Sequence, residues 1–144
     1  LLYSADEATA LYSVACFGRS AGAGAQLRVS QADNDVADVV RGATAIAQSK
    51  PYITVWRSDG GAYSLRLNRQ EEALTVGGGA NTGDWFGDTS NRDSVTLGAY
   101  KENGEGYFSK GPLMLVAAWE PDLPVSIIQQ LERMVARDYA VAIP

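Results

Sequence analysis

The chain has 144 residues, of which 46% are apolar and 20% charged, a composition typical of one globular domain and not of a disordered chain. It carries 12 Lys and Arg against 17 Asp and Glu, for a net charge of −5, with no histidine and one cysteine. These counts exclude histidine-based triads, histidine metal sites and an intramolecular disulfide, and they make an acidic chain a poor nucleic-acid binder.

The first predicted element is a helix over about 5–17. Residues 4–7 read Ser-Ala-Asp-Glu, a capping box in which serine and glutamate satisfy each other's backbone N–H groups. Apolar residues follow at helical spacing, and Gly18 suits the position after a helix C-terminus. The stretch 13–17 is also compatible with a strand.

A second helix is predicted after a glycine-rich loop at 18–25 and a short strand at 26–30. Residues 33–35 offer side-chain caps, and Pro51 lies beyond the end. The predicted apolar stripe consists of Val36, Val39, Val40, Ala43, Ile46 and Ala47.

From Tyr52 the pattern changes to that of strands. Residues 52–56 are rich in β-branched and aromatic side chains, 58–61 read Ser-Asp-Gly-Gly, and 63–67 alternate apolar with polar. This order predicts a β-hairpin, since glycine adopts the positive φ that tight hairpin turns require. We interpret 71–76 as a further strand.

The remainder is predicted to hold a long loop at 77–94, a strand at 95–100, a turn at 103–104 and a strand starting at Tyr107. Residues 113–119 lack alternation, which favours a central strand covered on both faces. A final helix is expected to begin near Pro124.

Together these elements predict a single globular domain over 1–144 of the α+β class. We expect a two-layer domain with an antiparallel sheet of five to six strands. The N-terminal, internal and C-terminal helices would pack mainly on one face of that sheet.

The 77–94 loop is the strongest candidate for function, because structureless loops of this length are uncommon and often functional. It combines five glycines with Trp85 and Phe86, flanked by Asp84 and Asp88. We predict that Asp84, Trp85, Phe86 and Asp88 bind a protein partner, since tryptophan is enriched at interface hot spots. The alternative is that both aromatic side chains fold back over the domain's own core.

Phosphate and metal sites are weaker interpretations of the same loop. The glycines at 77–83 are not followed by Gly-Lys-Ser/Thr, and they form no dinucleotide fingerprint. The acids at 84, 88 and 93, with Asn91, could supply oxygen ligands, but their spacing does not match a calcium-binding loop. We therefore expect neither a metal nor a cofactor.

Catalysis is also disfavoured, and no catalytic residue is assigned. Cys16 has no histidine to activate it, and no Ser-x-x-Lys pattern precedes any lysine. The favoured function is a non-catalytic recognition domain of the inhibitor or immunity type, steered by its acidic charge toward a basic protein. The alternatives are a small-molecule sensor domain and a histidine-free hydrolase that uses carboxylates.

Membrane insertion is not expected, because no run of 18 apolar residues is present. The chain begins with Leu1 rather than methionine, which favours a processed protein of the periplasm or the extracellular space. The oligomeric state stays open.

Overall fold

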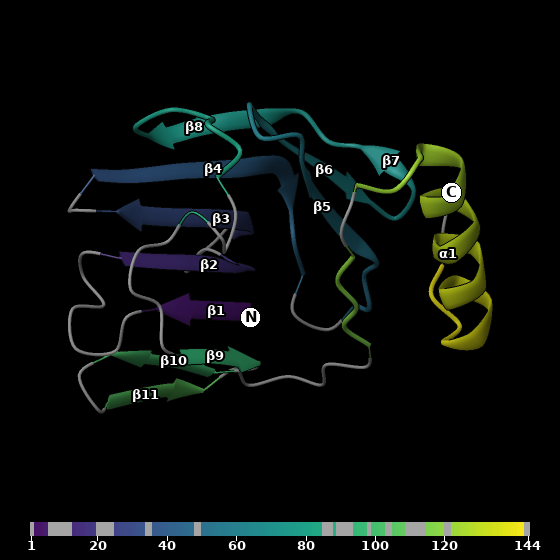
Figure 1. The fold of residues 1–144 in the computed structure, drawn as a ribbon. Helices are drawn as coiled ribbons and strands as arrows, with labels where there is room; N and C mark the ends of the chain where they lie inside the picture. Colours follow the sequence, from purple (N-terminus) through teal and green to yellow (C-terminus); the bar gives the residue numbers. More distant parts are fainter. Residues whose placement is uncertain are drawn as a thin grey trace.

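The protein is of the mixed α+β class, with antiparallel sheets and a C-terminal helix in a computed structural model (Figure 1). The structure describes residues 2–5, 13–19, 25–33, 36–47, 50–84, 88, 94–97, 99–102, 105–108, 115–119 and 122–142. Its elements are β1 (Leu2–Ala5), β2 (Ser13–Arg19), β3 (Gln26–Asp33), β4 (Val36–Ala45), β5 (Thr54–Ser58), β6 (Tyr63–Leu67), β7 (Gln70–Glu71), β8 (Leu74–Gly78), β9 (Ser94–Leu97), β10 (Ala99–Glu102), β11 (Glu105–Phe108) and α1 (Val125–Asp138).

The strands form three antiparallel sheets within the described residues. The large sheet has six strands in the order β8-β4-β3-β2-β1-β9. A second sheet has the order β5-β6-β7, and β10 pairs with β11. The α+β class and the antiparallel pairing predicted from the hairpin patterns are thus confirmed.

Two of the three predicted helices are wrong. The structure places strands β1 and β2 at the two ends of the helix expected over about 5–17, and β4 where the internal helix was expected. Within the described residues α1 is the one helix, and it confirms the helix predicted from Pro124 onward.

The apolar residues of the internal segment fit both the 3.6-residue repeat of a helix and the two-residue repeat of a strand, so their spacing alone does not decide between the two. Val36, Val39 and Val40 lie on one helical face, but valine loses side-chain freedom in a helix and packs well in a sheet. Gly42 also disfavours a helix interior. Antiparallel pairing with β3 on one side and β8 on the other then decides the outcome.

The β5–β6 hairpin forms as predicted, with Thr54 opposite Leu67 and Ser58 opposite Tyr63. In the turn, Gly60 adopts a φ of 82°. The Asp59 carboxylate accepts hydrogen bonds of 2.9 Å from the backbone N–H groups of Gly61 and Ala62. These N–H groups lower the pKa of Asp59, because they stabilise its charged form.

The central strand predicted over 113–119 is wrong for its described part. Residues 115–119 form no strand and are exposed, with Trp119 at 53% exposure. The large sheet ends at β8 and β9, so this apolar run has no place in its interior. An apolar run indicates a preference for burial but does not supply a neighbouring strand.

The core lies between the large sheet and the β5-β6-β7 sheet. Val29 and Val40 of the large sheet pack against Tyr63 of β6, with Trp56 and Leu74 at the margin. The Trp56 and Tyr63 rings meet edge to face, with centroids 6.4 Å apart. Trp56 therefore lies on the face of the small sheet that packs toward the core.

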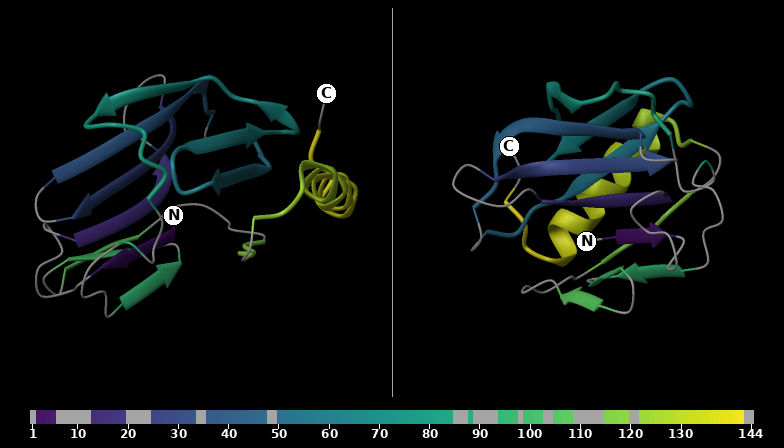
Figure 2. Two further views of the ribbon diagram at one scale, coloured as in Figure 1. Left: turned by 45° about the horizontal axis from the view of Figure 1, so that its top comes forward. Right: turned by 90° about the vertical axis from the view of Figure 1, so that its left-hand side faces the viewer.

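Helix α1 covers the other side of the small sheet (Figure 2). Ala136 and Val141 pack against Ile53, which precedes β5. The arrangement is sheet, sheet and helix, so the predicted two-layer order is wrong: the hairpin inserts between the large sheet and the helix. No helix in the described part of the chain is both long enough and apolar enough to cross a membrane.

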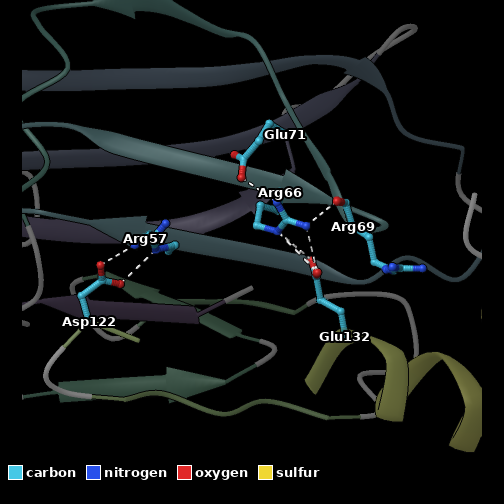
Figure 3. Close-up of polar contacts among 6 residues, drawn as sticks. All are labelled: Arg57, Arg66, Arg69, Glu71, Asp122 and Glu132. Atoms are coloured by element: carbon cyan, nitrogen blue, oxygen red, sulfur yellow. Dashed lines mark hydrogen bonds and ion pairs between the residues drawn. The ribbon is translucent and has the colours of Figure 1, made fainter. Parts of the chain in front are cut away.

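A buried ion pair joins α1 to β6 (Figure 3). Arg66 is 4% exposed and Glu132 is 1% exposed. Arg66 Nε donates to Glu132 Oε1 at 3.2 Å, and its Nη2 donates to Oε2 at 3.1 Å. Arg66 also donates to Glu71 at 2.6 Å and to the Arg69 carbonyl. The hydrogen bond to Glu132 raises the pKa of Arg66, which therefore stays charged in the core.

We expect Glu132→Gln to lower the free energy of unfolding by about 3 kcal/mol, because Arg66 would be buried without its main counter-charge. Chemical denaturation measures this loss. The control is Asp138→Asn, which breaks the exposed pair with Arg137 and should change nothing measurable. Combining Arg66→Met with Glu132→Leu should recover most of the stability. Equal stability of the Glu132→Gln and Asp138→Asn variants would contradict a structural role for the pair.

Candidate functional site

The candidate site is the loop that follows β8. Gly77 and Gly78 belong to β8 and Ser94 to β9, so the loop is shorter than predicted. The structure describes residues 79–84, which we call the loop base, and Asp88 beyond it. Trp85 and Phe86 lie outside the described residues.

Strand β4 holds one side of the loop base through Asp38. Asp38 Oδ1 accepts a hydrogen bond of 2.6 Å from the backbone N–H of Ala80. The Thr82 hydroxyl lies 3.2 Å from Asp38 Oδ2 and 2.6 Å from Asp84 Oδ2. The carboxylates of Asp38 and Asp84 therefore both contact the polar groups of residues 80–82 in the loop base.

Strand β6 holds the other side through Tyr63. The Asn81 side chain accepts from the Tyr63 backbone N–H at 2.7 Å and donates to the Tyr63 carbonyl at 3.2 Å. The Asn81 side-chain amide thus makes the pair of backbone hydrogen bonds that a neighbouring strand would make with the first residue of β6. The Tyr63 hydroxyl donates to the Asp84 carbonyl and lies 3.2 Å from Gln31 of β3.

Gly83 lies against the hairpin turn and has to be a glycine. Its φ is 71°, and a Cβ there would lie 2.5 Å from the backbone nitrogen of Ala62. The Ser58 hydroxyl donates to the Gly83 carbonyl. The glycine allows close contact between the loop base and the β5–β6 turn.

The loop base is a negatively charged environment. Burial is the main cause that raises the pKa of Tyr63, and the charges of Asp84, Asp38 and Asp88 raise it further. The Tyr63 phenol therefore stays neutral and can keep its hydrogen bonds. Asp88 is exposed and Asp84 is half-buried.

The predicted site residues thus have different places. Asp84 belongs to the anchored base, with its carboxylate on Thr82 and its carbonyl on Tyr63. Asp88 lies at the surface. Among the described side chains, no three Asp, Glu or Cys come together in a way that could hold a metal ion.

Sequence reasoning missed Asp38, Tyr63 and Asn81 as the anchors of this loop. Asp38 lay in a predicted helix, and Tyr63 lay in a predicted hairpin strand with no contact to the loop foreseen. The one available signal was Asn81, because asparagine commonly bonds to nearby backbone in turns.

Comparisons with protein-family models, with curated proteins and with solved structures find no match to this chain.

We expect Gly83→Ala to lower the free energy of unfolding by about 2 kcal/mol, because the new Cβ meets the Ala62 backbone and positive φ is strained. The matched control is Gly60→Ala, which also has positive φ, at 82°, but meets nothing within 4 Å. It should lose about 1 kcal/mol. Thermal or urea unfolding distinguishes the two, and equal losses would contradict close packing at Gly83.

The raised pKa of Tyr63 predicts a loss of stability in alkali. The unfolded phenol ionises near its ordinary pKa of 10.0 whereas the folded one stays protonated, so stability present below pH 10 falls as pH rises further. Tyr63→Phe should be less stable by about 1 kcal/mol at pH 8, because it loses the hydroxyl bonds.

That difference between the wild type and Tyr63→Phe should shrink above pH 10, because only the wild type carries this titration. Urea unfolding of both proteins from pH 8 to pH 11 measures it. The other tyrosines are common to both proteins and serve as the internal control. A constant difference across this range would mean that Tyr63 titrates normally.

Proposed function

We propose that the protein is a non-catalytic recognition domain that binds another protein through residues 84–88, the recognition segment. The observation that carries the proposal is the anchoring of the loop base on both sides. Asp38 of β4 holds Ala80 and Thr82, and Tyr63 of β6 holds Asn81 and Asp84. The loop base is thus held before binding and loses little conformational freedom when a partner binds.

The residue types of the recognition segment suit a protein interface. Trp85 and Phe86 offer large apolar contacts, and Asp84 and Asp88 flank them with negative charge. Aromatic side chains supply most of the binding free energy at many interfaces, and surrounding charges select the partner. The net charge of −5 favours a basic protein as the partner.

The carboxylates near the loop support binding rather than catalysis. Asp38 and Asp84 accept hydrogen bonds that hold the loop base in place, which are structural tasks. With no histidine, the chain offers no imidazole base to activate its single cysteine or a serine.

We expect Trp85→Ala to weaken partner capture on the order of tenfold or more, because the variant loses its largest apolar anchor. The experiment immobilises the wild type and variants, captures proteins from a lysate of the source organism, and quantifies them by mass spectrometry. Trp119→Ala is the matched control, since Trp119 is 53% exposed and lies outside the loop.

The proposal expects a basic protein that the wild type and Trp119→Ala retain and that Trp85→Ala loses, with equal melting temperatures for all three. If Trp85→Ala lowers the melting temperature and captures the same proteins, the aromatic residues belong to the domain's own core. In that case the recognition function assigned to this segment is wrong.

A further inference from the structure

Strand β8 leaves one edge of the large sheet open. It is the terminal strand in the order β8-β4-β3-β2-β1-β9, and no described strand pairs with its outer side. Thr75, Val76 and Gly77 are all exposed, with Val76 at 47%. Proteins protect such edges with lysine, proline, short strands or β-bulges. Strand β8 contains neither lysine nor proline, but it has only five residues and its pairing with β4 shifts register between Val39 and Val40. Figure 1 shows β8 at the upper edge of the sheet.

Two arginines lie side by side next to this edge. Arg28 of β3 is directly opposite Arg41 of β4, and Arg41 is opposite Thr75 of β8. Like charges at directly opposite positions repel each other. The Arg28 guanidinium bonds to Ser30 at 3.2 Å, whereas Arg41 makes no hydrogen bond or salt bridge with the described residues.

The Arg41 side chain extends across β8 toward the open edge. A Cβ built on Gly77 would lie 3.2 Å from Arg41 Nε and 3.4 Å from its Cζ. The guanidinium therefore lies over Gly77, in the space that a side chain would otherwise fill. Its Nε is buried without a partner, as is the Nε of Arg28. Buried donors without partners are uncommon in folded proteins, so each one calls for a physical explanation.

Strand β8 offers different chemistry on its two faces. Thr75 and Gly77 lie on the face that carries Arg41, while Val76 is opposite Val40 and shares the face of the apolar core. A strand added to β8 would alternate between these faces, because successive side chains in a strand point to opposite sides. Its residues would meet positive charge on one face and exposed valine on the other.

We propose that β8 binds an extended acidic peptide segment of a partner protein, which adds to the sheet as a further strand. The backbone of β8 supplies the main-chain hydrogen bonds, Arg41 binds a carboxylate on one face, and Val76 contacts an apolar side chain on the other. The binding mode is strand addition, in which the backbone gives affinity and alternate side chains give specificity. This site is separate from the recognition segment and does not depend on it.

Charge argues against a second copy of this chain as the occupant. Antiparallel pairing of β8 with β8 of another copy, centred near Val76, would place both copies of Arg41 on the same face close to one another. The two guanidinium groups would repel each other, as would the Arg28 groups behind them. An acidic strand removes this repulsion and also supplies an acceptor for Arg41 Nε, which has none among the described residues.

The test uses two blocked peptides, Thr-Glu-Val-Glu-Val-Glu-Thr and the same sequence with glutamine in place of glutamate. Binding is measured by NMR, from the amide shifts of residues 74–78 as each peptide is titrated into the labelled protein. The glutamate peptide should shift these amides, and Arg41→Gln should weaken its binding about fivefold to tenfold. The glutamine peptide should bind more weakly, and its affinity should not change in the variant.

Two further variants control for charge and folding. Gly77→Ala should displace the Arg41 guanidinium and reproduce the loss, with all arginines retained. Arg133→Gln removes an exposed cation from α1 and should leave binding of the glutamate peptide unchanged. The melting temperature of Arg41→Gln should equal or exceed that of the wild type, because a repelling charge is removed.

Three results would overturn the proposal. One is equal binding of the glutamate and glutamine peptides to the wild type. Another is that the amide signals of residues 74–78 do not shift at glutamate peptide concentrations up to about 1 mM, which would mean that the dissociation constant is well above the millimolar range. The third is self-association of the wild type through β8, detected by sedimentation and abolished in Gly77→Ala.

Discussion

The buried ion pair between Arg66 and Glu132 is the interaction on which the layered arrangement depends. It attaches α1 to one face of β6, while Leu65 and Tyr63 on the other face of the strand pack toward the large sheet. Because Arg66 also bonds to Glu71 and to the Arg69 carbonyl, its donors are satisfied and the charge can stay in the core. The small sheet is therefore held from both sides.

The same strand connects this ion pair to the candidate site. Tyr63 begins β6, and its backbone and hydroxyl hold Asn81 and Asp84 of the loop base, whereas Arg66 near the other end holds the helix. A rigid strand thus joins the docking of α1 to the position of the loop. Recognition loops on well-packed scaffolds keep their geometry before binding, which lowers the entropy lost on association.

Strand β4 separates the two kinds of charge on the large sheet. Asp38 lies on the face that holds the acidic loop base, and Arg41 lies on the opposite face beside the open edge of β8. The separation follows from the alternation of side chains along a strand. An acidic protein can in this way carry a local positive surface. The acidic face near Asp38 would favour a basic partner, and the positive face near Arg41 would favour an acidic one.

Local signals predicted some of these elements well. The turn residues at 58–61 and the alternation at 63–67 were sufficient for the hairpin, and the apolar spacing after Pro124 was sufficient for α1. The internal segment at 36–45 was predicted wrongly because its valines fit both a helical stripe and a strand. For the site, the sequence indicated the loop and its acids but not Asp38 or Tyr63. Asp38 bonds to Ala80, 42 residues away in the chain, and Tyr63 bonds to Asp84, 21 residues away.

By itself, then, the sequence determined what depends on near neighbours: the excluded chemistries, the hairpin and the last helix. The tertiary structure alone decided that β4 is a strand, that α1 docks through Arg66 and Glu132, and that Arg41 lies across Gly77. The physical reason is that pairing between strands and ion pairs between distant residues are set by the whole fold. A local pattern records which residues prefer burial or charge, but not which partner satisfies them.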